Sequence, residues 1–159
     1  MSSNEISLGV SLPLDSDGFL RRECPTCDRE FKWLHSVEGE QETVPVPSGG
    51  YFCPYCGVQA PSNAWFTQEQ SSLITNTVTT DAVDPMIKKF GNQINDIARR
   101  SRGAMNANIR FTPTEKLDPL TEINDMTRII FECHPSEPIK VLDDWNEQIH
   151  CLICGEPKQ

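Results

Sequence analysis

Seven cysteines in 159 residues constrain the fold of this chain more than any other feature. Six of them form Cys-x-x-Cys pairs, and the seventh stands next to a histidine: Cys24 and Cys27, Cys53 and Cys56, Cys151 and Cys154, then Cys133 beside His134. Two thiolates at this spacing can face one ion from a single tight turn, and two such turns supply the four ligands that structural zinc prefers. Because seven is odd, disulfide pairing alone would leave one thiol over. The count instead fits four cysteines in one site, and three cysteines with one histidine in a second.

The rest of the composition favours metal ligation over disulfides. Hydrophobic residues make up only 37 % of the chain, and small domains with thin cores are commonly held together by metals or disulfides. The N-terminus has no basic region followed by an apolar run, so it does not read as a signal peptide. No stretch approaches the ~20 apolar residues of a membrane span. We therefore expect a cytoplasmic protein, where paired cysteines are more often metal ligands.

The first site combines Cys24-Pro-Thr-Cys27 with Cys53-Pro-Tyr-Cys56-Gly57. Gly57 suits the positive φ that follows such a turn, and Asp28, at the equivalent place, tolerates it second best. These paired turns resemble those of zinc ribbons, which implies a structural Zn²⁺. They are also similar to rubredoxins, which implies an iron electron carrier as an alternative, but Asp28 and the long loop between the turns weaken that reading. A redox-active pair would begin a helix after a strand, and neither pair has that setting.

The second site has three clear ligands, Cys133, Cys151 and Cys154. By analogy with the first site, the opposing turn supplies two ligands, which favours His134 as the fourth. His150 is the rival, although it precedes Cys151 on an expected strand, where neighbouring side chains point to opposite faces. Glu137 or a water is the third alternative, and a water would leave an open, catalytic position. With no other catalytic motif in the sequence, we expect a non-enzymatic protein with two Zn²⁺ per chain.

The middle of the chain is predicted to be helical. Thr67 and Gln70 have capping-box spacing, and Asp84-Pro85 resembles a second helix start. From there Ile87, Phe90, Ile94 and Ile97 form an apolar stripe that ends before Gly103. Whether 67–83 joins this helix is left open. A strand is expected at 108–111, followed by a Pro-rich connector.

These elements predict an α+β protein in which two small antiparallel zinc-ribbon modules bracket one or two amphipathic helices. The expected parts are an N-terminal arm at 1–18, a first ribbon at 19–62, a helical middle and connector at 63–126, and a second ribbon at 127–159. The ribbon hairpins are expected to cover the apolar stripe, with Trp33, Trp65, Phe66 and Trp145 in the core. The order of Ser11 to Cys27, Cys133-His-Pro and His150-Cys-Leu-Ile-Cys-Gly resembles a group of little-characterised bacterial proteins with two ribbons around a helical middle.

Charge is unevenly distributed within the net −9. Residues 88–116 hold seven basic and two acidic side chains, a net +5, whereas 117–159 hold three basic and nine acidic, a net −6. The basic helix residues that could contact nucleic acid or an acidic partner are Lys88, Lys89, Arg99, Arg100 and Arg102. The favoured interpretation is pairing with the acidic block of the same chain or of a dimer mate. We expect an adaptor or regulatory module that binds a protein partner and no membrane, with a nucleic-acid-associated regulator as the alternative.

Overall fold

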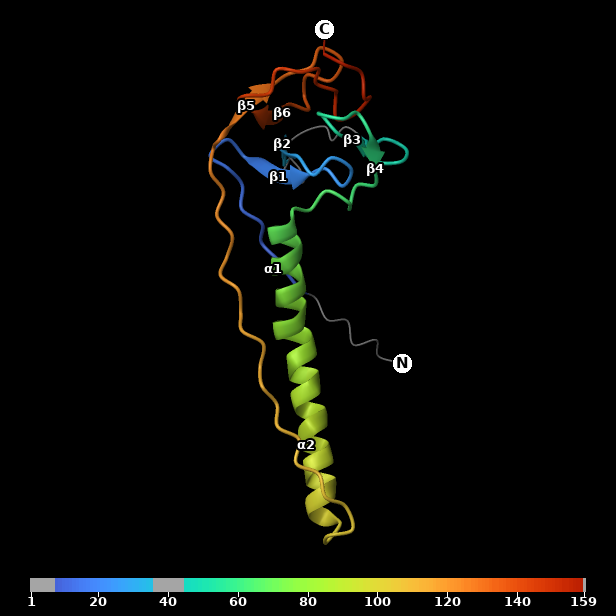
Figure 1. Ribbon diagram of the computed structural model, residues 1–159, viewed down its shortest axis with the longest axis vertical. Coiled ribbons are helices and arrows are strands. Elements are labelled where there is room, and N and C mark those ends of the chain that lie inside the picture. The colour runs from blue at the N-terminus through green and yellow to red at the C-terminus, as the bar shows by residue number, and fades with distance from the viewer. Residues whose placement is uncertain (1–7, 36–44, 159) are drawn as a thin grey trace. The chain divides into compact units, whose positions relative to one another are not determined.

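The computed structural model describes residues 8–35 and 45–158. In chain order, its elements (Figure 1) are β1 (Phe19–Glu23), β2 (Glu30–Leu34), β3 (Tyr51–Phe52), β4 (Gln59–Ala60), α1 (Gln68–Val78), η1 (Thr79–Val83), α2 (Asp84–Arg100), β5 (Met126–Ile129) and β6 (Ile139–Leu142). This combination of helix and antiparallel sheet agrees with the expected α+β class. The chain separates into two compact units. Leu12–Gln70 with Leu120–Gln159 form the cysteine-rich unit, and Met1–Ser11 with Ser71–Pro119 form the helical unit.

The main sheet of the cysteine-rich unit takes strands from both halves of the sequence. It has four antiparallel strands in the order β1-β2-β6-β5, and β3 pairs with β4 in a separate two-stranded sheet. At the centre, β2 and β6 place Lys32 opposite Lys140 and Trp33 opposite Ile139. The backbone hydrogen bonds of this pair connect residues more than 100 positions apart in the chain.

This pairing corrects the expected division of the chain. The segments 19–62 and 127–159 share one sheet, because β6 extends the sheet that β1 and β2 begin. The same unit takes in part of the expected arm, from Leu12, and the end of the expected connector, from Leu120. The two cysteine segments therefore stabilise each other.

Aromatic side chains fill the core where the two segments meet. Phe31 is fully buried, and its ring meets the ring of Trp65 edge-on at 5.7 Å and that of Tyr55 at 6.5 Å. Trp33 and Trp145 pack against the same cluster, as expected from the sequence. Phe66 instead lies partly exposed, with the Arg22 guanidinium over its ring at 5.0 Å. Offset and edge-on ring contacts of this kind add to the stabilisation from burial.

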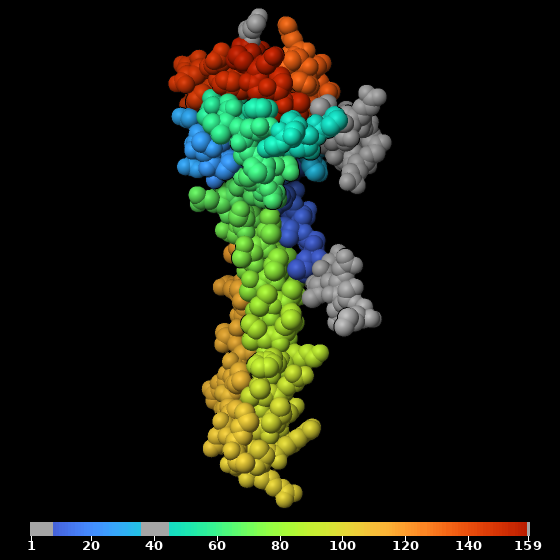
Figure 2. All heavy atoms as spheres, turned by 90° about the vertical axis from the view of Figure 1, so that its right-hand side faces the viewer, coloured from blue at the N-terminus to red at the C-terminus, as the bar shows by residue number. Residues whose placement is uncertain are grey.

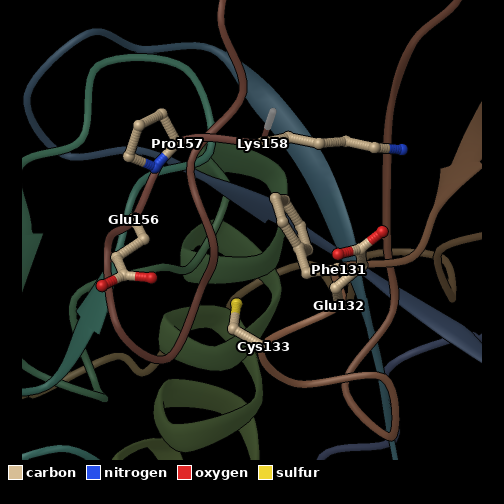
Figure 3. Close-up of a pocket in the computed structure, with 6 residues that line it drawn as sticks. All are labelled: Phe131, Glu132, Cys133, Glu156, Pro157 and Lys158. Atoms are coloured by element: carbon tan, nitrogen blue, oxygen red, sulfur yellow. The ribbon is translucent and has the colours of Figure 1, made fainter.

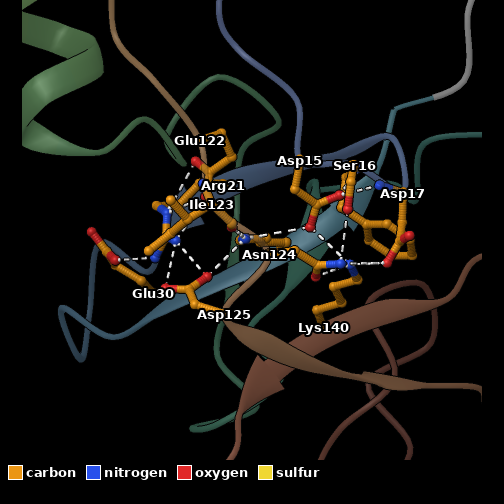
Figure 4. Close-up of polar contacts among 12 residues, drawn as sticks. Asp15, Ser16, Asp17, Arg21, Glu30, Glu122, Ile123, Asn124, Asp125 and Lys140 are labelled. Carbon is orange, nitrogen blue, oxygen red and sulfur yellow. Dashed lines mark hydrogen bonds and ion pairs between the residues drawn. The ribbon is translucent and has the colours of Figure 1, made fainter.

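Two lysines lie inside the sheet, and this was not predicted. Lys32 and Lys140 are fully buried and directly opposite each other, an arrangement that like charges normally disfavour. The buried Asp15 carboxylate resolves the conflict, because one of its oxygens lies 3.3 Å from Lys32 Nζ and 2.8 Å from Lys140 Nζ (Figure 4). Burial alone would raise the pKa of Asp15, but Lys140 and two backbone N–H groups outweigh it and lower that pKa to about 2.

Carboxylates from the segment before β5 complete this buried network. Glu122 and Asp125 lie 2.9 Å and 2.8 Å from Lys32 Nζ. Both also bind the Arg21 guanidinium, at 2.7 Å each, and Glu30 binds Arg21 at 2.7 Å (Figure 4). The network therefore joins β1 and β2 to the chain that enters β5.

The helix begins as the sequence predicts. The backbone N–H of Gln70 donates to Thr67 Oγ1 and the N–H of Thr67 donates to Gln70 Oε1, both at 3.1 Å, which is a capping box. The Gln70 amide also donates to the Arg21 carbonyl at 2.9 Å. The start of α1 is thereby attached to β1.

The expected second start at Asp84-Pro85 is not a break. The helix continues through η1, where the N–H of Asp84 donates to the carbonyl of Thr79, five residues back. Pro85 has no N–H to offer, and a π-type turn adjusts the backbone before it. The Asp84 carboxylate accepts hydrogen bonds from the N–H and the hydroxyl of Thr114 instead of capping a helix. Residues 67–83 thus join the second helix, which ends at Arg100 before Gly103 at φ +90°.

Residues 104–119 run beside the helix as an extended connector held by helix side chains. The Asn95 amide donates to the Ile109 carbonyl and accepts from the Ile109 N–H, both at 2.8 Å. Asn76 repeats the pattern, donating to the Glu115 carbonyl at 2.8 Å and accepting from the Leu117 N–H at 2.9 Å. The strand expected at 108–111 does not form, because a side chain of α2 takes the hydrogen bonds of Ile109.

Within the helical unit, most of the apolar stripe of α2 is left uncovered. Ile87, Phe90 and Ile97 are 50 %, 61 % and 55 % exposed. The buried residues of α2 are instead Asp84, Gly91 and Ala98, on the adjoining face. Within the described residues, no helix combines the length and apolar character needed to cross a bilayer.

Candidate metal centres

Three segments of the cysteine-rich unit share one turn: Cys24–Arg29, Cys53–Val58 and Cys151–Glu156. In each, the N–H of the fifth residue donates to the carbonyl of the first cysteine at 2.9 Å. The N–H of that cysteine donates in turn to the carbonyl of the sixth residue, at 2.8–3.0 Å. The three segments therefore repeat one local structure.

The fifth residue of each turn has positive φ, as expected for Asp28 and Gly57. The φ values are +55° at Asp28, +70° at Gly57 and +73° at Gly155. Only this conformation lets the chain reverse directly after the second cysteine, and Gly and Asp adopt it at the lowest cost.

The same turns direct backbone donors at sulfur. The N–H of Thr26 lies 3.4 Å from Cys24 Sγ, and the N–H groups of Tyr55 and Cys56 lie 3.4 Å and 3.5 Å from Cys53 Sγ. Hydrogen bonds to a sulfur favour its charged form. These donors therefore prepare the cysteines to bind a cation as thiolates.

The first centre is formed by Cys24, Cys27, Cys53 and Cys56, whose sulfurs all lie within 4.8 Å of one another. Two sulfur pairs, Cys24 with Cys56 and Cys27 with Cys53, are 3.8 Å apart. Zinc bonded to four sulfurs at ~2.3 Å in a tetrahedron has sulfurs separated by ~3.8 Å. The spacing therefore matches a tetrahedral four-thiolate site.

Burial changes the pKa values of the cysteines in this centre. It raises the pKa of Cys24 and raises that of Cys53 strongly. Burial acts in the same direction on Cys27, but the Arg29 backbone and the neighbouring thiols outweigh it, so that pKa is lowered. A bound dication reverses the penalty on buried thiolates, because a coordinating thiol is deprotonated. The site is thus unfavourable to four free thiolates and suited to a metal.

The second centre is formed by Cys133, His134, Cys151 and Cys154, whose ligand atoms also lie within 4.8 Å of one another. The sulfurs of Cys133 and Cys154 are 3.6 Å apart, and Cys151 Sγ is 3.5 Å from His134 Nδ1. A tetrahedral zinc with one nitrogen ligand would separate that nitrogen from a sulfur by ~3.6 Å. Of the three alternatives for the fourth ligand, the structure brings His134 into the group.

His150 lies in a different setting. Its backbone N–H donates to the Pro54 carbonyl at 2.8 Å, and its Nδ1 lies 3.3 Å from the same oxygen. Its ring covers Gly57, where an added Cβ would meet it at 3.2 Å. His150 therefore supports the turn of the first centre.

Phe52 covers the turn of the second centre in the way that His150 covers the turn of the first. Its ring covers Gly155, where an added Cβ would lie 2.7 Å away, and its N–H donates to the Leu152 carbonyl at 2.9 Å. Phe52 and His150 each directly precede the first cysteine of a turn. The two turns thus cover each other reciprocally, and His150 occupies the place that Phe52 has in the first module.

This correspondence predicts opposite results for the two histidines. We expect His134→Ala to lower the metal count of the purified protein from two to one, because it removes a ligand. We expect His150→Phe to retain both ions, because phenylalanine stands at the equivalent position. Metal analysis of both variants provides the measurement. Loss of the second ion from His150→Phe but not from His134→Ala would reverse the assignment.

Exposure distinguishes the two centres. Cys24 and Cys53 of the first centre are buried, whereas Cys133 of the second is exposed. Cys133 lines a pocket of about 500 Å³ together with Phe131, Glu132, Glu156, Pro157 and Lys158 (Figure 3). The pKa of Cys133 is raised to about 12 by partial burial and by the adjacent thiols. Solvent and small chelators can thus reach one ligand of the second centre directly.

No protein-family model, curated protein or solved structure matches this chain. What the structure supports is two cysteine-rich clusters able to bind metal ions. The resemblance to zinc ribbons rests on the cysteine turns themselves.

The basic residues singled out by the sequence lie in the helical unit. Lys88, Lys89, Arg99, Arg100 and Arg102 are all exposed. The Arg99 guanidinium forms an ion pair with Asp96 on the same helix. In the acidic block, Glu122 and Asp125 bind Arg21 and Lys32 of the cysteine-rich unit. At least these two acids thus have partners other than the basic helix.

Sequence reasoning missed the network around Asp15. A signal was present: Phe31-Lys32-Trp33 and Ile139-Lys140-Val141 each place a lysine between hydrophobic residues in a short strand. Such a lysine is normally read as the solvent side of an edge strand. Because the two strands pair with each other, both lysines are enclosed.

Proposed function

We propose that this is a non-enzymatic, cytoplasmic protein in which two structural zinc ions hold the cysteine-rich unit rigid for recognition by a protein partner. The observation that most directly supports this proposal is the pair of four-ligand clusters at tetrahedral spacing. Structural zinc sites are closed by four protein ligands, whereas catalytic sites keep a position for water or substrate. Two closed sites favour a scaffold.

Native mass spectrometry of the purified chain tests the metal part of the proposal. We expect two ions per chain, each with the mass of zinc. Iron in the first centre would instead support the electron carrier, and coloured protein would show this at once. A folded chain without metal would overturn the proposal.

The adaptor role has its own test, with the histidine variants as a matched pair. A partner captured by the wild type and by His150→Phe, but not by His134→Ala, would support recognition that depends on the metal-held unit. Binding that is equal for all three proteins would contradict it. Turnover of a substrate at either centre would contradict the non-enzymatic assignment.

A second candidate, nucleic-acid association, is favoured by the exposure of all five basic residues on and after α2. Phosphate contacts by Lys and Arg make affinity fall steeply as salt rises. We would measure binding of duplex DNA and single-stranded RNA at ~50 mM salt and upward. Replacing Lys88, Lys89, Arg99, Arg100 and Arg102 by glutamine should then flatten the salt dependence. No binding at the lowest salt would exclude this candidate.

A further inference from the structure

The helical unit has almost no core of its own. Among its described residues, Leu73 and Ala98 are the hydrophobic side chains that are buried. Its exposed large hydrophobic residues are Val78, Val83, Met86, Ile87, Phe90, Ile97, Met105, Ile109 and Leu117. Large exposed apolar patches mark interaction sites in soluble proteins. A helix with one apolar face obtains most of its stability by burying that face.

The apolar stripe of α2, exposed except for the half-buried Ile94, has the spacing of a coiled-coil seam. Val83, Ile87, Phe90, Ile94 and Ile97 follow one another at four, three, four and three residues. Apolar residues repeating every 3.5 residues form a straight stripe that a second helix can cover, with each side chain inserting between four of the other helix. The stripe thus fits an α-helix as its occupant.

The connector occupies the neighbouring face and leaves the seam open. Asp84, Gly91 and Ala98, spaced seven apart, are the buried residues of α2. An added Cβ at Gly91 would lie 3.1 Å from Ile109 of the connector, so the connector contacts the helix backbone closely there. In Figure 2 the connector is orange and the helix green to yellow. The connector's Met105 and Ile109 are themselves exposed and extend the apolar surface beside the seam.

The charges along the helical segment favour a second copy of this chain, running antiparallel, as the helix that covers the stripe. Residues 68–87 contain Glu69, Asp81 and Asp84 and no Lys or Arg. Residues 88–102 contain five basic residues and one acid, Asp96. Two copies running antiparallel place each basic end beside the end that has no Lys or Arg, and they also oppose their helix dipoles favourably. Parallel copies would place the basic ends together.

We propose that α2 pairs with α2 of a second copy of this chain as an antiparallel coiled coil. The seam sets the register: Ile87 lies opposite Ile97 of the second copy, and Phe90 opposite Ile94. Residues 99–102 then lie beside 82–85 of the second copy, a stretch without Lys or Arg. The stripe that is exposed in one chain becomes the core of the pair.

Sedimentation of the full, metal-loaded chain tests the pairing. We expect a dimer, and we expect Phe90→Glu to raise its dissociation constant ~100-fold or more, because each copy loses one buried aromatic residue. Asn92→Glu is the matched control, since Asn92 is exposed on the other side of the same helix; it should leave the dimer intact. Ile97→Ala should weaken the dimer although alanine favours helix. A weaker dimer of Ile97→Ala could therefore not be explained by a lower helix propensity.

Orientation is tested by a photo-crosslinking amino acid at position 97 in a mixture of isotopically light and heavy chains. Antiparallel pairing predicts light–heavy crosslinks to the peptide around Ile87. Crosslinks to the peptide around Ile97 would show parallel pairing and overturn the proposed orientation. A monomer at ~100 µM, or a dimer unaffected by Phe90→Glu, would overturn the proposal itself. Metal content, measured on the same samples, reports separately on the proposed function.

Discussion

Removing the metal ions is expected to unfold the cysteine-rich unit. Structural zinc contributes on the order of 10–16 kcal/mol of apparent binding energy per site in model peptides. The net stability of a typical domain is only ~5–15 kcal/mol. The centres also lie within the core, since Cys24, Cys53 and Cys151 are part of its cluster of buried residues. Without ions, closely spaced thiols would be left within the buried core.

The measurement is titration with a chelator, followed by near-ultraviolet circular dichroism and tryptophan fluorescence. Trp65 is buried in the affected core, so its emission should shift to longer wavelength as the unit unfolds. We expect two steps, because a chelator reaches the exposed Cys133 before the buried Cys53. Cys133→Ser should abolish the first step, and Cys53→Ser should prevent folding of the unit. A metal-free protein with an unchanged near-ultraviolet spectrum would contradict this prediction.

Replacing Asp15 by alanine is expected to destabilise the protein by ~3–5 kcal/mol, the usual cost of removing one partner from a buried ion pair. The Asp15 carboxylate contacts both Lys32 and Lys140, which are buried and directly opposite each other. Without it, the two opposed ammonium groups would lose the one carboxylate that lies between them, although Lys32 keeps Glu122 and Asp125 and Lys140 keeps Asp17. The loss should appear as a lower midpoint of denaturant unfolding, measured with zinc in excess.

Asp17→Ala is the matched control. Asp17 contacts Lys140 at 2.6 Å, but its side chain is 51 % exposed, and we expect its removal to lower the unfolding midpoint much less than the removal of Asp15 does. Adding Lys140→Met to Asp15→Ala should recover part of the lost stability, because it removes one of the opposed charges. Equal destabilisation by Asp15→Ala and Asp17→Ala would show that the buried bridge has no special role.

The pKa values define the pH range of this effect. Asp15 has a lowered pKa of about 2, so its stabilisation is complete above the ordinary value of 3.8 and is lost as pH falls toward 2. The carboxylates of Asp125 and Glu122 raise the pKa of Lys32 despite its burial. The stabilisation that charged Lys32 contributes is therefore complete below its ordinary pKa of 10.5 and is lost as pH rises above that value. The stability difference between wild type and Asp15→Ala should stay constant from pH ~6 to ~9.

The amino-acid sequence by itself was sufficient to indicate the seven cysteine ligands of the two centres. The chemistry of Cys24-Pro-Thr-Cys27 is local: two thiols and their turn lie within a few residues, and Gly57 marks the backbone conformation that the turn needs. The capping box at Thr67 and Gln70 and the end of the helix before Gly103 are local in the same way. Such features depend on neighbouring residues, so a pattern in the sequence is enough to predict them.

Only the tertiary structure decided how these pieces combine. The pairing of β2 with β6 encloses Lys32 and Lys140, and no local pattern shows that two lysines more than 100 residues apart will meet. Likewise, Asn95 holds the connector against one face of α2, which leaves the Ile87 and Phe90 face open. The choice of His134 over His150 also required knowing that the turns of the two modules cover each other. In each case the deciding contacts join distant segments, and their free energy depends on burial that exists only in the folded chain.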